Sequence, residues 1–168
     1  MTRTREMRRK EKEITNPEEI KDMLETCAVC RLGLSEEGVP YVIPINYGYT
    51  YAEDVITVFF HCAREGRKID IMKQNPVVCF EIDRVERLDP AGSPENISLK
   101  WESLIGTGRA QFVEDCDEKK KLLGNMMRIY GGYNPHYRPE VLSDERVHGV
   151  TMFKIVLDEF KAKRILHD

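Results

Sequence analysis

The stretch VITVFFHCAREGRKIDIMKQNPVVCFEID, residues 55–83, holds two apolar runs on either side of a short charged segment. Residues 55–60 are β-branched or aromatic and have the length and composition of a strand. Residues 77–82 form a second run of this kind, directly after Asn75-Pro76, a pair that ends whatever element precedes it. The sequence therefore predicts two strands joined by one short helix, roughly residues 66–74.

The predicted helix begins with two cations, Arg67 and Lys68. Positive side chains there oppose the positive end of the helix dipole, so the arrangement is unfavourable unless an anion binds at the same terminus. A phosphate suits the free backbone N–H groups and the two basic side chains, and His61 closes the strand that leads to them. The alternative is that Arg67 and Lys68 are solvated surface charges and that His61 only ends the strand.

Three blocks of sequence have a recognisable spacing. HCAREGRK at residues 61–68, followed by NPVVCF at 75–80, has the form H-x-A-x-x-G-R-K…N-P-x-V-x-F, while residues 38–47 read GVPYVIPINY and residues 101–110 read WESLIGTGRA. In this order they resemble the pyridoxamine-phosphate-oxidase-like flavoproteins, and within that family the nitroimidazole-resistance type. The resemblance implies that the chain binds FMN on a split β-barrel and forms a homodimer with the flavin at the subunit interface.

The strand predicted from residue 40 onwards is interrupted by Pro44 and Asn46. Because proline cannot donate to a ladder, this strand is expected at a sheet edge or at a bulge. The pyrimidine edge of a flavin ring needs unpaired backbone groups or a short amide side chain. Asn46 and the backbone of residues 44–47 can supply both. The alternative is an ordinary edge strand in which the proline blocks aggregation.

If the resemblance holds, Lys68 binds the FMN phosphate as a point charge and Arg67 binds it through two bonds. His61 binds the ribityl or phosphate group, or donates a proton near the ring, and is the candidate catalytic residue. Trp101 stacks near the cofactor from the partner subunit or packs in the core. The predicted cofactor-binding residues are Pro44, Ile45, Asn46, Tyr47, His61, Arg67, Lys68, Trp101, Glu102 and Ser103.

The length of 168 residues fits one domain, predicted over residues 14–168 behind a basic, flexible arm of residues 1–13. The net charge of −3 gives no electrostatic case for nucleic-acid binding, and no apolar run has membrane-spanning length. We therefore expect a soluble cytoplasmic protein. Its five cysteines are expected to be free thiols. Cys27 and Cys30 form a C-x-x-C sequence, and no second such pair follows. These two cysteines are therefore expected to pack in the core and not to bind a metal.

The remaining segments predict a mainly β barrel with flanking helices, of six or seven mostly antiparallel strands and three helices. Gly106 and Gly108 indicate a bend or a close approach of another backbone within their strand. The other predicted elements are a helix capped by Asn16, a strand over residues 29–34, a hairpin turn at 35–38, a loop over 84–98, a strand over 99–113, a helix over 117–130, a flavin-covering lid or surface segment over 133–146, and a closing hairpin of 150–157 with 160–166.

The function that the resemblance implies is that of an FMN-dependent oxidoreductase. It would pass electrons from NAD(P)H or another donor to a small acceptor such as a nitroaromatic compound, with the redox chemistry supplied by the flavin. Two alternatives remain open. One is a flavin-binding or redox-sensing protein without catalysis, and the other is a haem- or deazaflavin-binding member of the same barrel.

Overall fold

The computed structural model describes residues 6–88, 99–131 and 143–165. Its strands form one sheet in the order β3-β2-β6-β7-β8-β5-β4, with β1 beside β8, and the pairings are antiparallel. The predicted fold class is confirmed, with eight strands in the described part of the chain. The strands are β1 (Glu13–Ile14), β2 (Val29–Glu36), β3 (Val39–Asn46), β4 (Gly48–Ala52), β5 (Val55–Cys62), β6 (Val77–Leu88), β7 (Leu99–Val113) and β8 (Thr151–Ile165).

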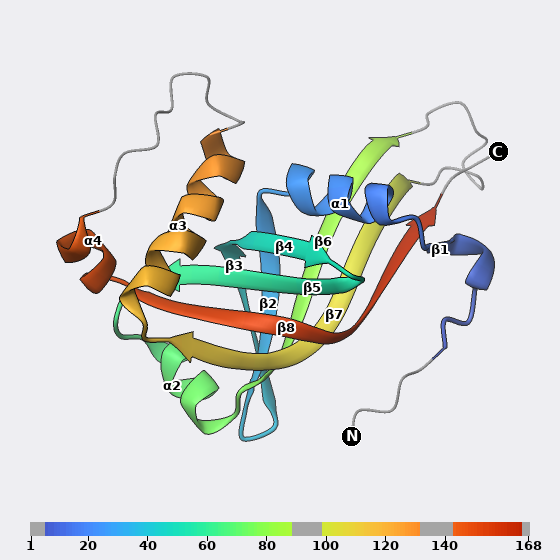
Figure 1. The fold of residues 1–168 in the computed structure, drawn as a ribbon. Coiled ribbons are helices and arrows are strands. Elements are labelled where there is room, and N and C mark those ends of the chain that lie inside the picture. The colour runs from blue at the N-terminus through green and yellow to red at the C-terminus, as the bar shows by residue number, and fades with distance from the viewer. Residues whose placement is uncertain (1–5, 89–98, 132–142, 166–168) are drawn as a thin grey trace.

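Helices α1 (Pro17–Thr26) and α2 (Arg67–Gln74) lie near opposite ends of the curled sheet, and α3 (Cys116–Gly131) lies along its side (Figure 1). Each of the first two buries an apolar face in the main core, through Met23 and Leu24 of α1 and through Ile71 and Met72 of α2. The fourth helix, α4, covers Asp144–His148. Burial of these faces fixes both helices against the barrel.

The hairpin between β2 and β3 turns through two residues with positive φ, Glu37 at 50° and Gly38 at 85°. Such a turn matches the right-handed twist of its strands. Among the described strands, β3 pairs only with β2, so it forms one edge of the sheet, while β4 forms the other edge. Tyr47 alone separates these two strands. The prediction that Pro44 marks an edge strand is confirmed.

The predicted closing hairpin across Asp158-Glu159 is wrong. Residues 151–165 form one strand, β8, which pairs with β7 from Met152 to Ile165 and shifts register between Thr107 and Gly108. The shift leaves Asp158 as an extra residue opposite β7, because Thr107 pairs with Glu159 and Gly108 with Leu157. A Cβ on Gly108 would lie 2.3 Å from the Val156 carbonyl oxygen, which confirms the close backbone approach expected there.

The local signals at the start of the chain agree with the structure. Asn16 caps α1, since its side chain accepts a hydrogen bond from the Glu18 N–H. Strand β6 continues to Leu88, so the loop predicted from residue 84 starts too early. Residues 89–98 lie outside the described residues, as do residues 133–142 of the lid or surface segment predicted over 133–146, whose last residues cap and begin α4. A 3-10 turn at Lys10–Lys12 leads into β1, while the division into arm and domain stays a prediction.

Candidate functional site

The first turn of α2 lies beside the β2–β3 hairpin, and Arg67 joins the two. Its Nε and Nη2 donate to one carboxylate oxygen of Glu36, at 3.1 and 2.8 Å. The guanidinium carbon lies 4.4 Å from the centroid of the Tyr41 ring. Gly66 precedes the helix with φ at 137°, and no side chain caps this terminus. The anion that compensates Arg67 at the positive helix end is therefore a carboxylate of the chain itself.

Lys68, the next residue, has different surroundings. Its side chain is half-buried and makes no ion pair with any residue that the structure describes. Burial raises the pKa of the neighbouring Cys62 thiol, and the positive charge of Lys68 works against that rise. Lys68 is thus a cation next to an uncapped helix terminus, with its charge available to an external anion.

The outer side of β3 carries unpaired backbone groups. Pro40 and Pro44 occupy positions of the same parity, opposite Ser35 and Arg31 of β2. Since proline has no N–H, we place the peptide groups of these residues on the free side of the strand, where they remove no ladder bond. Carbonyl oxygens therefore outnumber N–H groups along this edge.

Asn46 ends β3 with an oriented amide. Its Nδ2 donates to the Ala28 carbonyl at 3.0 Å, so Oδ1 is the end of the amide that can accept another bond. Tyr47, by contrast, belongs to the core: its hydroxyl donates to the Leu24 carbonyl at 2.9 Å, and its own carbonyl accepts from the Tyr130 hydroxyl at 2.8 Å. Ile45 packs against the core as well, which leaves Pro44 and Asn46 as the exposed members of this predicted group.

His61 lies on the last part of β5, opposite Met152 of β8. Its side chain is exposed at the surface, yet desolvation by the surrounding protein lowers the pKa of the imidazole. The shift favours the neutral form of the ring. No hydrogen bond or ion pair within the described ranges joins His61 to Arg67 or Lys68.

The predicted group at residues 101–103 lies elsewhere in the same chain. On β7, Ser103 pairs with Asp83 of β6, and the strands β6 and β2 separate it from β3. The ammonium group of Lys163 lies 5.2 Å from the centroid of the Trp101 indole ring. Within one chain the structure does not bring these residues to Pro44 or Asn46.

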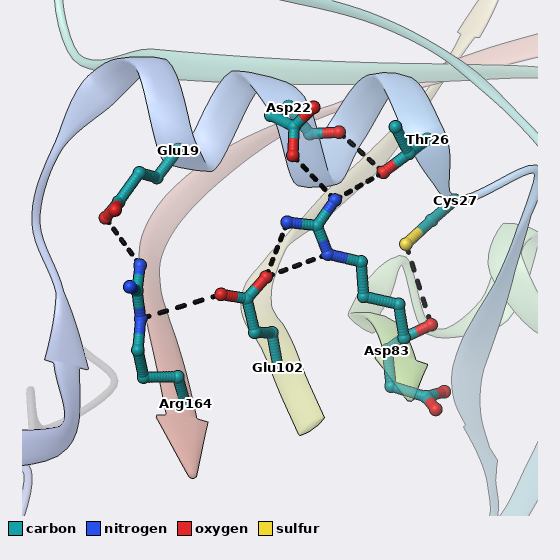
Figure 2. A network of polar contacts seen from close by, with 8 residues as sticks. Glu19, Asp22, Thr26, Cys27, Asp83, Glu102 and Arg164 are labelled. Carbon is teal, nitrogen blue, oxygen red and sulfur yellow. Dashed lines mark hydrogen bonds and ion pairs between the residues drawn. The ribbon is translucent and has the colours of Figure 1, made fainter. Parts of the chain in front are cut away.

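Glu102 lies at the centre of an ion-pair network beneath α1 (Figure 2). It is 6% exposed, and its carboxylate meets Arg84 Nη2 at 2.6 Å and Arg164 Nε at 3.5 Å. Arg84 also donates to Asp22 and Thr26 of α1, at 2.6 and 2.8 Å. Through these bonds the carboxylate of Glu102 helps to hold α1 on the sheet. The predicted role of Glu102 in binding the cofactor stays a prediction.

One face of the sheet carries large apolar side chains that no described helix covers. The register places Val42 beside Gly33, Gly33 beside Cys79, and Cys79 beside Thr107, so these side chains share the outer face. Thr107 Oγ1 is buried in this row without a hydrogen-bond partner in the described part of the chain. The exposed apolar residues of this face are Val29, Val42, Val55, Val77, Val85, Ile105 and Val156.

The cysteines of the C-x-x-C sequence pack into the protein as predicted. Cys30 is fully buried, and burial raises its thiol pKa to about 12. Burial also raises the pKa of Cys27 to about 11, and its Sγ donates to the Asp83 carbonyl at 3.5 Å. No group of three or more potential metal ligands occurs in residues 6–88, 99–131 and 143–165. None of the helices in these ranges is long and apolar enough to span a bilayer.

Sequence reasoning missed Glu36 and Tyr41 as partners of Arg67. Glu36 is separated from Arg67 by 31 positions and lies in the segment expected to form a hairpin turn. Neither residue has a motif that indicates the contact. Only the packing of α2 against β2 brings them together.

The family of the chain follows from comparison with known proteins. The model of the pyridoxamine 5'-phosphate oxidase family matches residues 16–164. The chain therefore belongs to the pyridoxamine 5'-phosphate oxidase family. No curated protein matches the chain.

Solved structures of similar fold include a candidate 5-nitroimidazole antibiotic resistance protein from Bacteroides thetaiotaomicron. It is 28% identical with a TM-score of 0.76, and the match covers 90% of this chain and 86% of that one. This similarity confirms the predicted branch of the family. The flavocytochrome Anf3 of Azotobacter vinelandii is 21% identical with a TM-score of 0.76, and the match covers 99% and 75% of the two chains.

A third structure of the same fold is an FAD and haem binding protein from Mycobacterium smegmatis. It is 16% identical with a TM-score of 0.76, and the match covers 93% of this chain and 74% of that one. At this level of identity the likeness shows the fold alone.

Proposed function

We propose that the chain binds FMN and acts as an oxidoreductase, passing electrons from NAD(P)H or another donor to a small acceptor such as a nitroaromatic compound. The proposal rests on the presence of two kinds of group in the same chain, a cation at a helix start and a free strand edge. Lys68 lies without an ion-pair partner in the described ranges at the uncapped start of α2, and β3 presents a carbonyl-rich free edge that ends in Asn46. Lys68 suits the anionic phosphate. On the free edge of β3, the carbonyl groups and Asn46 Oδ1 suit the one N–H donor of a flavin's pyrimidine edge, and the N–H groups of Val42 and Asn46 suit its carbonyl acceptors.

The bound flavin would supply the electron transfer, and the residues of the chain would bind and orient it. Lys68 would neutralise the phosphate, and Asn46 Oδ1 would accept a hydrogen bond from the ring. His61 would bind the ribityl or phosphate group, or donate a proton near the ring; the lowered pKa of its imidazole favours the binding role, because the neutral ring is a weak proton donor. The family to which the chain belongs supports this assignment.

We propose further that a second copy of the chain covers the apolar outer face of the sheet. The exposed apolar side chains of this face alternate with charged ones such as Arg31, Glu81 and Arg109, a mixture that suits a protein–protein interface. Within one chain β2 and β6 lie between β3 and β7, so we propose that Trp101 and Ser103 meet a flavin bound on β3 of the second copy. Free thiols suit a reducing compartment, so we place the protein in the cytoplasm.

Haem is the second candidate cofactor, because two of the similar structures are described as a flavocytochrome and as an FAD and haem binding protein. The two cofactors differ in absorption. A flavin gives two broad bands in the near-ultraviolet and the blue, and a haem gives one intense band in the violet. The spectrum of the purified protein and the identity of the released cofactor therefore separate FMN from FAD and haem.

The predicted role of Lys68 is tested by titrating the protein with FMN and following the quenching of flavin fluorescence. Lys68→Ala should weaken FMN binding by about tenfold or more, because a charge-assisted bond to phosphate is lost. Lys73→Ala, at the exposed end of the same helix, is the matched control and should bind as the wild type does. Protein that is purified colourless and takes up no FMN would contradict the proposed function.

Reduction by NADH or NADPH followed by reoxidation with a nitroaromatic compound tests the catalytic part of the proposal. Bleaching and recovery of the flavin absorption support an oxidoreductase. A flavin that stays oxidised with both nucleotides and with other donors supports the flavin-binding alternative without catalysis.

A further inference from the structure

A cleft with a volume of about 350 Å³ lies between β1, the start of α1, the β4–β5 turn and β8. The helix α2, where the proposed phosphate site begins, lies near the opposite end of the curled sheet (Figure 1). None of the described lining residues belongs to the group predicted to bind the cofactor. The cleft is lined by Glu13, Ile14, Thr15, Ile20, Tyr51, Asp54, Phe160, Lys161 and Ala162.

The cleft has an apolar floor and aromatic walls. Ile14, Ile20 and Ala162 are buried and belong to the main core. Tyr51 and Phe160 pack against that core and meet each other edge to face, with their ring centroids 6.3 Å apart and their planes at 88°. Clefts of this volume with an apolar lining and a few polar groups are typical of small-molecule sites. This cleft therefore suits a ligand with an apolar body of about one ring.

The polar groups at the rim leave one carboxylate in excess. The Lys161 ammonium pairs with the Glu13 carboxylate at 2.7 Å, so these two charges offset each other. Asp54 is exposed and makes no ion pair with any residue in the described part of the chain, and its carboxylate accepts only a long hydrogen bond, at 3.4 Å, from the Tyr51 hydroxyl. A carboxylate next to an aromatic ring favours a cationic ligand.

The β4–β5 turn determines which of two adjacent carboxylates lines the cleft. Glu53 and Asp54 are the only residues between the two strands, and both have positive φ, 52° and 61°. This is the backbone of a tight hairpin turn that asparagine, aspartate and glycine adopt readily and that costs more for glutamate. Asp54 lines the cleft, and Glu53 is outside its described lining. The pair thus offers a test residue and a matched control.

We propose that this cleft binds a small organic cation, a protonated primary amine attached to an apolar body of about one aromatic ring. The ammonium group pairs with Asp54, and the body packs between Tyr51 and Phe160 on the apolar floor. The site is separate from the proposed flavin site, so the proposal can be tested whether or not the chain binds FMN.

The backbone amide NMR signals of the full chain, followed during titration with three ligands of similar shape, test the proposed ligand class. Phenethylamine carries a cation, phenethyl alcohol is neutral and hydrocinnamate is an anion. The amine should bind with a dissociation constant on the order of 1 mM, about threefold or more tighter than the alcohol, and the anion should bind no tighter than the alcohol. The shifted signals should be those of residues 13–15, 51–54 and 160–162.

Three results of this titration would overturn the proposal. One is the absence of a saturable shift with the amine. Another is an anion that binds as tightly as the amine, because the cleft would then not select a positive charge. The third is a set of shifts confined to other parts of the chain.

Two variants of the turn test the role of Asp54. Asp54→Asn removes the charge at nearly constant size, and asparagine accepts positive φ, so the turn is kept. It should weaken amine binding by about threefold or more and leave alcohol binding within about twofold of the wild type. Glu53→Gln removes the neighbouring charge and should bind the amine as the wild type does. Equal losses in the two variants, or unchanged amine binding in Asp54→Asn, would overturn the role of Asp54.

Titration of the same two variants with FMN shows whether the cleft is separate from the flavin site. Both variants should take up FMN as the wild type does. A loss of FMN affinity in Asp54→Asn would overturn the separation of the two sites. A wild type that takes up no FMN but binds the amine at residues 51–54 would contradict the proposed function and leave the amine site standing.

Discussion

At the scale of single residues, the environment of a side chain decides its protonation and so the pH range in which it acts. Desolvation lowers the pKa of His61 in the folded protein, so the unfolded chain takes up this proton first as the pH falls. The stability linked to His61 is present above the unfolded value of about 6.5 and is lost as the pH falls through the folded pKa.

His61→Gln should therefore reduce the loss of stability as the pH falls below about 6.5. Urea denaturation at several pH values measures the effect. His148→Gln, which removes another exposed histidine of the described chain, is the control. Identical pH dependence in wild type and His61→Gln would show that His61 does not make this contribution.

At the scale of elements, the network beneath α1 shows why a buried charge needs more than one partner. Arg84→Met would leave the buried carboxylate of Glu102 with only Arg164, and would remove the bonds to Asp22 and Thr26. We expect a loss of about 2–3 kcal/mol in the free energy of unfolding, measured in urea.

Arg31 provides the comparison for this network. It lies on the neighbouring strand β2 and pairs with Glu81 and Asp83, but its side chain is 48% exposed against 30% for Arg84. Since solvent screens exposed pairs, Arg31→Met should cost less than about 1 kcal/mol. Equal losses for the two variants would contradict a special role for the Glu102 network in fixing α1.

At the scale of the whole molecule, the proposed homodimer depends on which face of the sheet stays uncovered. Val42 and Val39 lie on the same strand and are both 60% exposed, but they have opposite parity. Val42→Asp places a charge in the proposed interface and should shift the protein to monomers in sedimentation velocity. Val39→Asp should leave the dimer intact. A monomeric wild type, or a dimer that survives Val42→Asp, would contradict the proposed interface.

Much of the fold could be predicted because its signals are local. The cap formed by Asn16, the β-branched run at residues 55–60 and the proline at position 44 each act through neighbours in sequence. The single strand β8 could not be predicted, because nothing near Asp158 shows that β7 continues as its partner on both sides. A pair of acidic residues suits a turn and a bulge equally well, and the long neighbouring strand decides between them.

Some features of the candidate site likewise follow from the local sequence, and others follow only from the tertiary structure. The sequence by itself determined the uncapped helix start, the two adjacent cations and the edge position of β3, because each depends on a few consecutive residues. Only the tertiary structure decided the partners of the charged groups: Glu36 for Arg67, and Arg84 with Arg164 for Glu102. The physical reason is that a charged side chain pairs with the opposite charge nearest to it in space. Packing decides which residue that is, because it brings together residues that lie far apart along the chain.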